Sequence, residues 1–135
     1  MSSVFDSTGA LVPSMNERRW AAGVHLGAML LAFLTGWAAG VAGMVGAGAV
    51  AAIRPMDSEF VARHAREAFN FNLSLFIYAV LGGLLVIFTL GLGFLIVIPL
   101  ALLFLLLWLV CSIIASTRAL DGKEYRYPLT IRVWK

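Results

Sequence analysis

Charged residues divide the chain into three short charged segments and two long apolar ones. All ten Lys and Arg and all seven Asp and Glu lie within residues 1–19, 54–67 and 118–135. The stretches between them, residues 20–53 and 68–117, contain no Asp, Glu, Lys or Arg. Apolar stretches of this length are typical of membrane-spanning helices rather than of a soluble domain.

The length of each apolar stretch predicts two helices. As one helix, residues 20–53 would be about 50 Å long, which exceeds a hydrocarbon core of about 30 Å. A turn at residues 35–37 and a second at the glycines of residues 89–93 are the natural breaks. The expected helices are 20–34, 38–53, 68–88 and 94–117.

The distribution of charge predicts the orientation. With four spans, all three charged segments lie on one side of the membrane, which the positive-inside rule assigns to the cytoplasm. The sequence thus predicts an all-α membrane protein, a four-transmembrane-helix bundle in the inner membrane with both termini cytoplasmic. Residues 1–19 are expected to be a flexible tail in which Asn16 caps the first helix. Residues 54–67 are expected to form a cytoplasmic loop or interfacial helix, which passes without a proline or glycine break into the apolar residues that follow.

Composition supports lipid as the surrounding solvent. Apolar residues make up 61% of the chain, charged residues 13%, and the mean hydropathy is +0.94, whereas soluble domains are about half apolar and a quarter charged. The basic residues form no run interleaved with aromatic side chains, so a nucleic-acid partner is not expected. The lone Cys111 lies in an apolar segment and is expected to be buried and inert.

The third predicted helix, together with the charged residues that lead into it, carries most of the polar side chains between the two termini. One of its faces has polar residues every three or four positions: Arg63, Glu67, Asn70, Ser74 and Tyr78. The spacing also predicts ion pairs of Arg63 with Glu59 and Glu67. We expect Asn70 and Ser74 to face other helices as a hydrogen-bonded brace. A lining for a polar substrate path is the alternative.

No residues assemble into a catalytic, cofactor or metal site. His25 has no acidic or cysteine partner at ligand spacing, and both His25 and His64 are expected to pack and hydrogen-bond. Gly23 and Gly27, like Gly36 and Gly40, lie one turn apart and predict close helix contacts. The small residues 46–51 fit the same role better than nucleotide binding, because no strand precedes them.

The last charged segment, residues 118–135, changes to an alternating pattern. Apolar positions 125, 127, 129, 131 and 133 alternate with polar ones, which predicts an extended segment with one apolar face. Tyr, Trp and Arg suit the headgroup region, so this tail is expected beside residues 60–71. Arg63, Arg66, Tyr125 and Arg126 would then be available to a partner.

Three blocks carry a resemblance to a known family: A-A-G-V-H-L-G at 21–27, F-V-A-R-H-A-R-E-A-F-N-F at 60–71 and Y-R-Y-P-L-T-I-R at 125–132. Over about residues 20–135 the chain resembles the bacterial family of small membrane proteins related to the chloroplast inner-envelope translocon channel subunit. The resemblance implies four membrane helices and no catalytic role. The matching positions are His25, Phe60, His64, Glu67, Asn70 and residues 125–132.

These observations predict a non-enzymatic membrane component that binds the bilayer and either another membrane complex or itself. The alternative is a translocation or transport subunit whose pore forms between protomers, because the mid-membrane positions are mostly Leu, Val, Ala and Gly. No catalytic, metal or cofactor-binding residue is expected. The candidate interaction and packing residues are His25, Arg63, His64, Arg66, Glu67, Asn70, Ser74, Tyr125, Arg126, Tyr127 and Pro128.

Overall fold

The computed structural model describes residues 9, 11–35, 39–53 and 57–135, and these contain four helices and no strand. The helices are α1 (Met15–Thr35), α2 (Ala39–Ile53), α3 (Glu59–Phe88) and α4 (Phe94–Leu120). The all-α class and the four predicted helices are thereby confirmed. The charged residues from Glu59 onward and the third span form one continuous helix, α3, as the absence of a proline or glycine break between them indicated.

Helix α1 begins earlier than predicted because Ser14, not Asn16, caps it. The Ser14 hydroxyl oxygen accepts the Glu17 N–H at 3.3 Å, and the Glu17 carboxylate accepts the Ser14 N–H at 2.7 Å. This reciprocal pair is a capping box. Ser58 caps α3 by accepting the Val61 N–H, and its hydroxyl donates to Glu17. The bond from Ser58 joins the starts of α1 and α3 and lowers the pKa of Glu17.

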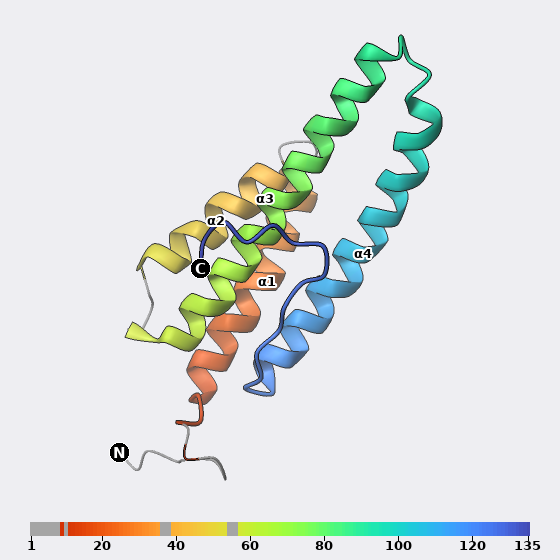
Figure 1. The fold of residues 1–135 in the computed structure, drawn as a ribbon. Coiled ribbons are helices and arrows are strands. Elements are labelled where there is room, and N and C mark those ends of the chain that lie inside the picture. The colour runs from red at the N-terminus through yellow and green to blue at the C-terminus, as the bar shows by residue number, and fades with distance from the viewer. Residues whose placement is uncertain (1–8, 10, 36–38, 54–56) are drawn as a thin grey trace.

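Helices α3 and α4 form a long hairpin that projects beyond the other two helices (Figure 1). With 30 residues α3 is about 45 Å long, whereas α2 with 15 residues is about 22 Å long. Helices α1 and α2 therefore accompany only the half of α3 near the charged end of the bundle. Most large apolar side chains on the outer halves of α3 and α4 are exposed, as lipid-facing residues would be.

Two helices of the described residues, α3 and α4, are long and apolar enough to cross a membrane. The sequence predicted four spans. Helix α2, at about 22 Å, does not cover a hydrocarbon core of about 30 Å, and α1, although about 31 Å long, carries Glu17, Arg18 and Arg19 near its start. Among the described helices, two therefore have the length and composition of membrane spans, and a shorter pair lies beside them.

Helices α2 and α3 approach closely through small residues. Ala47 and Ala51 of α2 are buried against Ala65 and Ala68 of α3. Such side chains let two helix backbones come close together, which is how helices associate in lipid.

Gly43 marks the tightest of these approaches. A Cβ atom there would lie 2.7 Å from Asn72 Oδ1 and 3.1 Å from the Ala28 carbonyl oxygen. By contrast, a Cβ at Gly23 or Gly27 would meet nothing within 4 Å. The expectation that Gly23 and Gly27 mediate helix contacts within the chain is therefore wrong. Residue 36, half of the other predicted pair, lies outside the described residues.

Helix α4 is lipid-facing over only part of its length. Its outer part exposes leucines, but its last turns bury Trp108, Cys111, Ala115 and Ala119. Between the outer halves of α3 and α4 lies an open groove of about 610 Å³. Its walls are almost entirely apolar, with Asn72 and Tyr78 as the polar side chains among them.

Candidate functional site

The residues after α4 form an extended tail that runs up beside α4 and then across α3 (Figure 1). The chain turns at Leu129, which has a φ of 56°. This turn separates the predicted alternating pattern into two parts with different surroundings. Tyr127 is buried, whereas Leu129 and Val133 are 62% and 65% exposed. The single apolar face expected along the tail is therefore wrong.

The polar face of α3 binds the backbone of this tail. Asn70 Oδ1 accepts the N–H groups of Val133 at 3.1 Å and Trp134 at 2.9 Å, and Asn70 Nδ2 donates to the Trp134 carbonyl at 2.7 Å. One amide side chain thus satisfies three backbone groups. An extended chain normally finds such partners in a neighbouring strand.

Three further side chains of α3 continue the same arrangement. Ser74 Oγ accepts the Ile131 N–H at 2.8 Å, and the Tyr78 hydroxyl donates to the Leu129 carbonyl at 2.7 Å. A carboxylate oxygen of Glu67 accepts the Tyr127 N–H at 2.8 Å. The brace predicted on α3 thus holds the tail, and the expectation that Asn70 and Ser74 face other helices is wrong.

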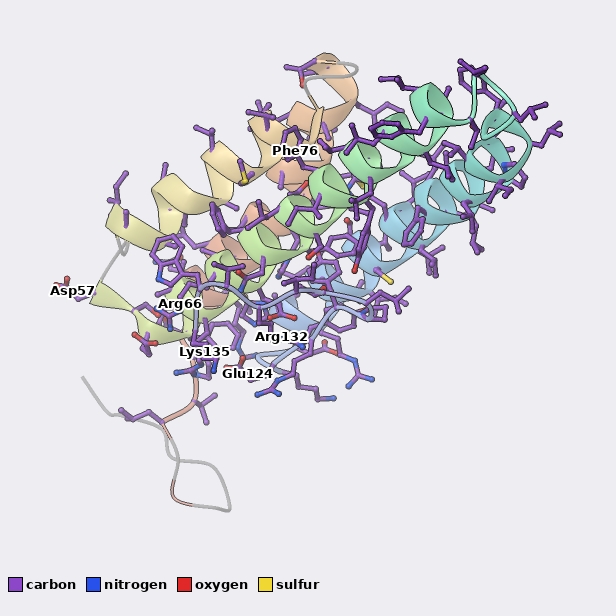
Figure 2. All side chains as sticks on the ribbon, turned by 45° about the horizontal axis from the view of Figure 1, so that its top comes forward. Asp57, Arg66, Phe76, Glu124, Arg132 and Lys135 are labelled. Atoms are coloured by element: carbon purple, nitrogen blue, oxygen red, sulfur yellow. The ribbon has the colours of Figure 1, made fainter. Side chains whose placement is uncertain are left out.

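Ion pairs surround the docked tail at the charged end of the bundle, where Figure 2 places Arg66, Glu124, Arg132 and Lys135. Arg63 binds Glu124 at 2.8 Å, and Arg132 binds Glu67 at 2.9 Å. Arg66 binds Glu59 within α3. The predicted pair of Arg63 with Glu67 is replaced by these two contacts with the tail, because both α3 residues find an oppositely charged partner there.

The remaining candidates of the tail lie around Tyr127. The ring of Tyr127 stacks on Phe71 with a centroid separation of 4.0 Å and an interplanar angle of 12°. Tyr125 packs edge-on against Tyr127, while Arg126 and Pro128 are exposed. Burial raises the pKa of the Tyr127 hydroxyl, which therefore stays protonated and able to donate a hydrogen bond.

The two histidines and Tyr127 form a buried hydrogen-bond chain that connects α1, α3 and the tail. His25 Nε2 and His64 Nδ1 are 2.8 Å apart, and His25 Nδ1 lies 2.9 Å from the Tyr127 hydroxyl oxygen. All three side chains are at most 3% exposed. The far nitrogen of His64, Nε2, has no hydrogen-bond partner among the described residues.

The geometry of the histidine pair is that of a hydrogen bond and not of a shared metal ion. The ring centroids are 5.1 Å apart, which is about the 2.8 Å nitrogen separation extended by one ring radius on each side. Both nitrogens therefore point along the line that joins them, whereas two ligands of one metal would point at a third position. Across the described ranges, no group of three or more His, Cys, Asp or Glu could hold a metal ion.

Sequence reasoning placed both histidines in packing roles but did not bring them together. His25 and His64 are 39 positions apart, and His25 and Tyr127 are 102 positions apart. The available signal was that each is a polar residue on a helix face rich in alanine. A buried polar residue needs a hydrogen-bond partner, and His25, His64 and Tyr127 act as partners for one another.

Comparison with known proteins gives a family. Residues 16–134 match the model of MamF/MmsF, described as the magnetosome magnetite crystal formation protein family. No curated protein and no solved structure matches the chain. The expected relationship to the chloroplast translocon family is therefore wrong, because the three blocks that suggested it lie within the region matched by the magnetosome family. No comparison supports the translocation alternative.

Proposed function

The chain belongs to the magnetosome magnetite crystal formation family, and from this membership we propose that it is a small integral protein of the magnetosome membrane. In this proposal it acts in magnetite crystal formation as a non-enzymatic component that binds other proteins of that membrane. The observation that carries the proposal is the family match over residues 16–134. The apolar hairpin of α3 and α4 is consistent with a membrane location.

The orientation that we propose follows from the charged end of the bundle. Helices α3 and α4 cross the bilayer, and α1 and α2 enter it as a shorter hairpin from the same side. Both termini then lie on one side, together with the ion pairs of α3 and the tail. The positive-inside rule assigns this side to the cytoplasm.

The partner-binding surface in this proposal is the cytoplasmic end. Arg126 is exposed there, as is Lys135 at the end of the tail. Neither residue forms an ion pair with another described residue. Exposed, unpaired positive charge speeds the approach of an acidic partner and adds to the affinity of the complex.

Deletion and complementation in a magnetosome-forming host test the proposal. We expect loss of the gene to change the size or number of magnetite crystals, and the wild-type gene to restore them. A tagged copy should purify with the magnetosome membrane. The double variant Arg126→Glu, Lys135→Glu should reach the membrane without restoring the crystals, while the control Leu129→Ala should restore them. Unchanged crystals in the deletion strain would contradict the proposal.

A further inference from the structure

The hydrogen-bond chain from Tyr127 through His25 to His64 has one free end. The bonds at 2.9 Å and 2.8 Å use the Tyr127 hydroxyl, both nitrogens of His25 and one nitrogen of His64. His64 Nε2 is left over and buried, without a partner in the part of the chain that the structure describes. The backbone of Lys123, at the start of the tail, lies near the His64 ring.

Counting protons shows that the chain has two complete arrangements. In the first, Tyr127 donates to His25, His25 donates to His64, and His64 Nε2 carries its proton at the free end. In the second, His64 Nδ1 donates to His25, His25 Nδ1 donates to the Tyr127 oxygen, and His64 Nε2 is a bare lone pair. A neutral histidine has one donor and one acceptor, so the two bonds reverse together.

We propose that uptake of one proton by this cluster fixes the second direction of the chain with His64 protonated on both nitrogens, and that the reversal at Tyr127 loosens the C-terminal tail. His64 is then an imidazolium, which donates from both nitrogens. His25 stays neutral: its Nε2–H bond breaks as that proton passes to His64 Nδ1, and the proton taken up forms a new N–H bond at His25 Nδ1, so the cluster gains one proton in all. The protein would thereby respond to acidification with a change in the docking of its tail.

Tyr127 is the residue through which the reversal reaches the tail. It contacts both histidine-bearing helices, through His25 on α1 and through Phe71 and Glu67 on α3. When its oxygen accepts from His25, its own proton needs a new acceptor, and Ser112 of α4 is the hydroxyl beside it. A buried imidazolium is also costly, and both effects weaken the hold on Tyr127.

Charges from three elements act on this cluster. Burial opposes a positive charge on His64 most strongly. Glu124 of the tail favours that charge, and on α3 Arg63 opposes it while Glu67 favours it. Cys111 of α4 and Tyr125 of the tail both disfavour a negative charge on the Tyr127 hydroxyl. Because burial opposes the charge, we expect His64 to take up its proton below the ordinary histidine pKa of about 6.5.

The proton positions can be read directly in the full chain in lipid nanodiscs. Nitrogen NMR of histidine-labelled wild-type protein distinguishes a protonated ring nitrogen from a bare one. As the pH is lowered from about 8 to about 4, through and below the ordinary histidine pKa of about 6.5, we expect His64 to become doubly protonated while His25 exchanges its proton from Nε2 to Nδ1 over the same pH range. A His64 that titrates without this change in His25 would overturn the proposal.

The position of the tail is measured separately by the distance between spin labels at Asp57→Cys and Lys135→Cys in a Cys111→Ala background. The docked fraction should fall on acidification in the wild type, and His64→Asn, which keeps a polar atom for His25 but does not titrate, should lose this pH dependence. The control Ser74→Ala lacks a different tail contact, so it should dock less at every pH and keep the dependence. A wild-type docked fraction that stays constant over this range would overturn the proposal.

Discussion

Replacement of Gly43 by alanine tests whether the close approach of α2 to α3 is as tight as the structure has it. The new Cβ atom would lie 2.7 Å from Asn72 Oδ1, closer than side chains tolerate, and 3.1 Å from the carbonyl oxygen of Ala28. Asn72 has little freedom to move, because it is buried and its amide donates to the Ala68 carbonyl at 2.8 Å. Either that hydrogen bond or the spacing of the helices must change.

The expected magnitude follows from two opposing terms. Forcing an extra methyl group into a packed core costs about 1–3 kcal/mol, whereas alanine favours a helix over glycine by about 1 kcal/mol. Gly43→Ala should therefore lower the free energy of unfolding by up to about 2 kcal/mol. Gly27→Ala is the matched control, since its Cβ meets nothing within 4 Å, and it should gain up to about 1 kcal/mol from the helix term alone.

Equilibrium unfolding in mixed micelles measures both variants against the wild type. The added substitution Asn72→Ala removes the closest clash, so Gly43→Ala should cost less in that background than in the wild type. Pairs in contact usually show such coupling, of about 0.5–3 kcal/mol. Equal stabilities for Gly43→Ala and Gly27→Ala would refute the packing described for α2 and α3.

Three further predictions concern the tail, the orientation and pH. Asn70→Ala removes three hydrogen bonds to the tail, each worth about 0.5–1.5 kcal/mol, so hydrogen exchange of the tail amides should accelerate; unchanged protection would show that other contacts hold the tail. Single cysteines at Asp57 and Lys135 should react with a membrane-impermeant reagent from the same side of the membrane, and labelling from opposite sides would rule out the proposed orientation. Because the Ser58 hydroxyl lowers the pKa of Glu17, the stability that this bond provides is present above the pKa of an unfolded glutamate, about 4.3, and is lost as the pH falls through the lower folded value. Ser58→Ala should flatten that acid dependence, and an unaltered dependence would show that Glu17 does not contribute to it.

The sequence predicted the helices well because the signals for them are local. The uncharged stretches, the glycines at residues 91 and 93 and the polar spacing on α3 each depend on neighbours along the chain. The start of α1 was missed although Ser14 and Glu17 have the spacing of a capping box. The spacing of Ser14 and Glu17 was visible in the sequence, but the prediction placed the cap at Asn16.

The partners of the polar residues were not predictable in the same way. The spacing of Asn70 and Ser74 places them on one face, but it does not say whether a helix or an extended tail lies there. An ion pair between residues three or four positions apart on a helix is worth only about 0.2–0.5 kcal/mol. Arg132 of the tail can therefore bind Glu67 in place of Arg63. The prediction also placed Gly27 in a helix contact, whereas a Cβ there meets nothing within 4 Å. A small residue is compatible both with a close contact and with open space, so the sequence alone does not decide between them.

The unequal lengths of the two helix pairs give the molecule a tapered cross-section. Four helices and the tail fill its charged end, whereas only α3 and α4 reach the opposite end (Figure 1). Inserted with the charged end in the outer leaflet of a vesicle, such a wedge occupies more area outside than inside and so relieves packing stress in a strongly curved wall. Small vesicles should then take up more of the protein per unit of lipid than large ones of the same composition, which sedimentation of a mixed population would measure; equal uptake would argue against the wedge.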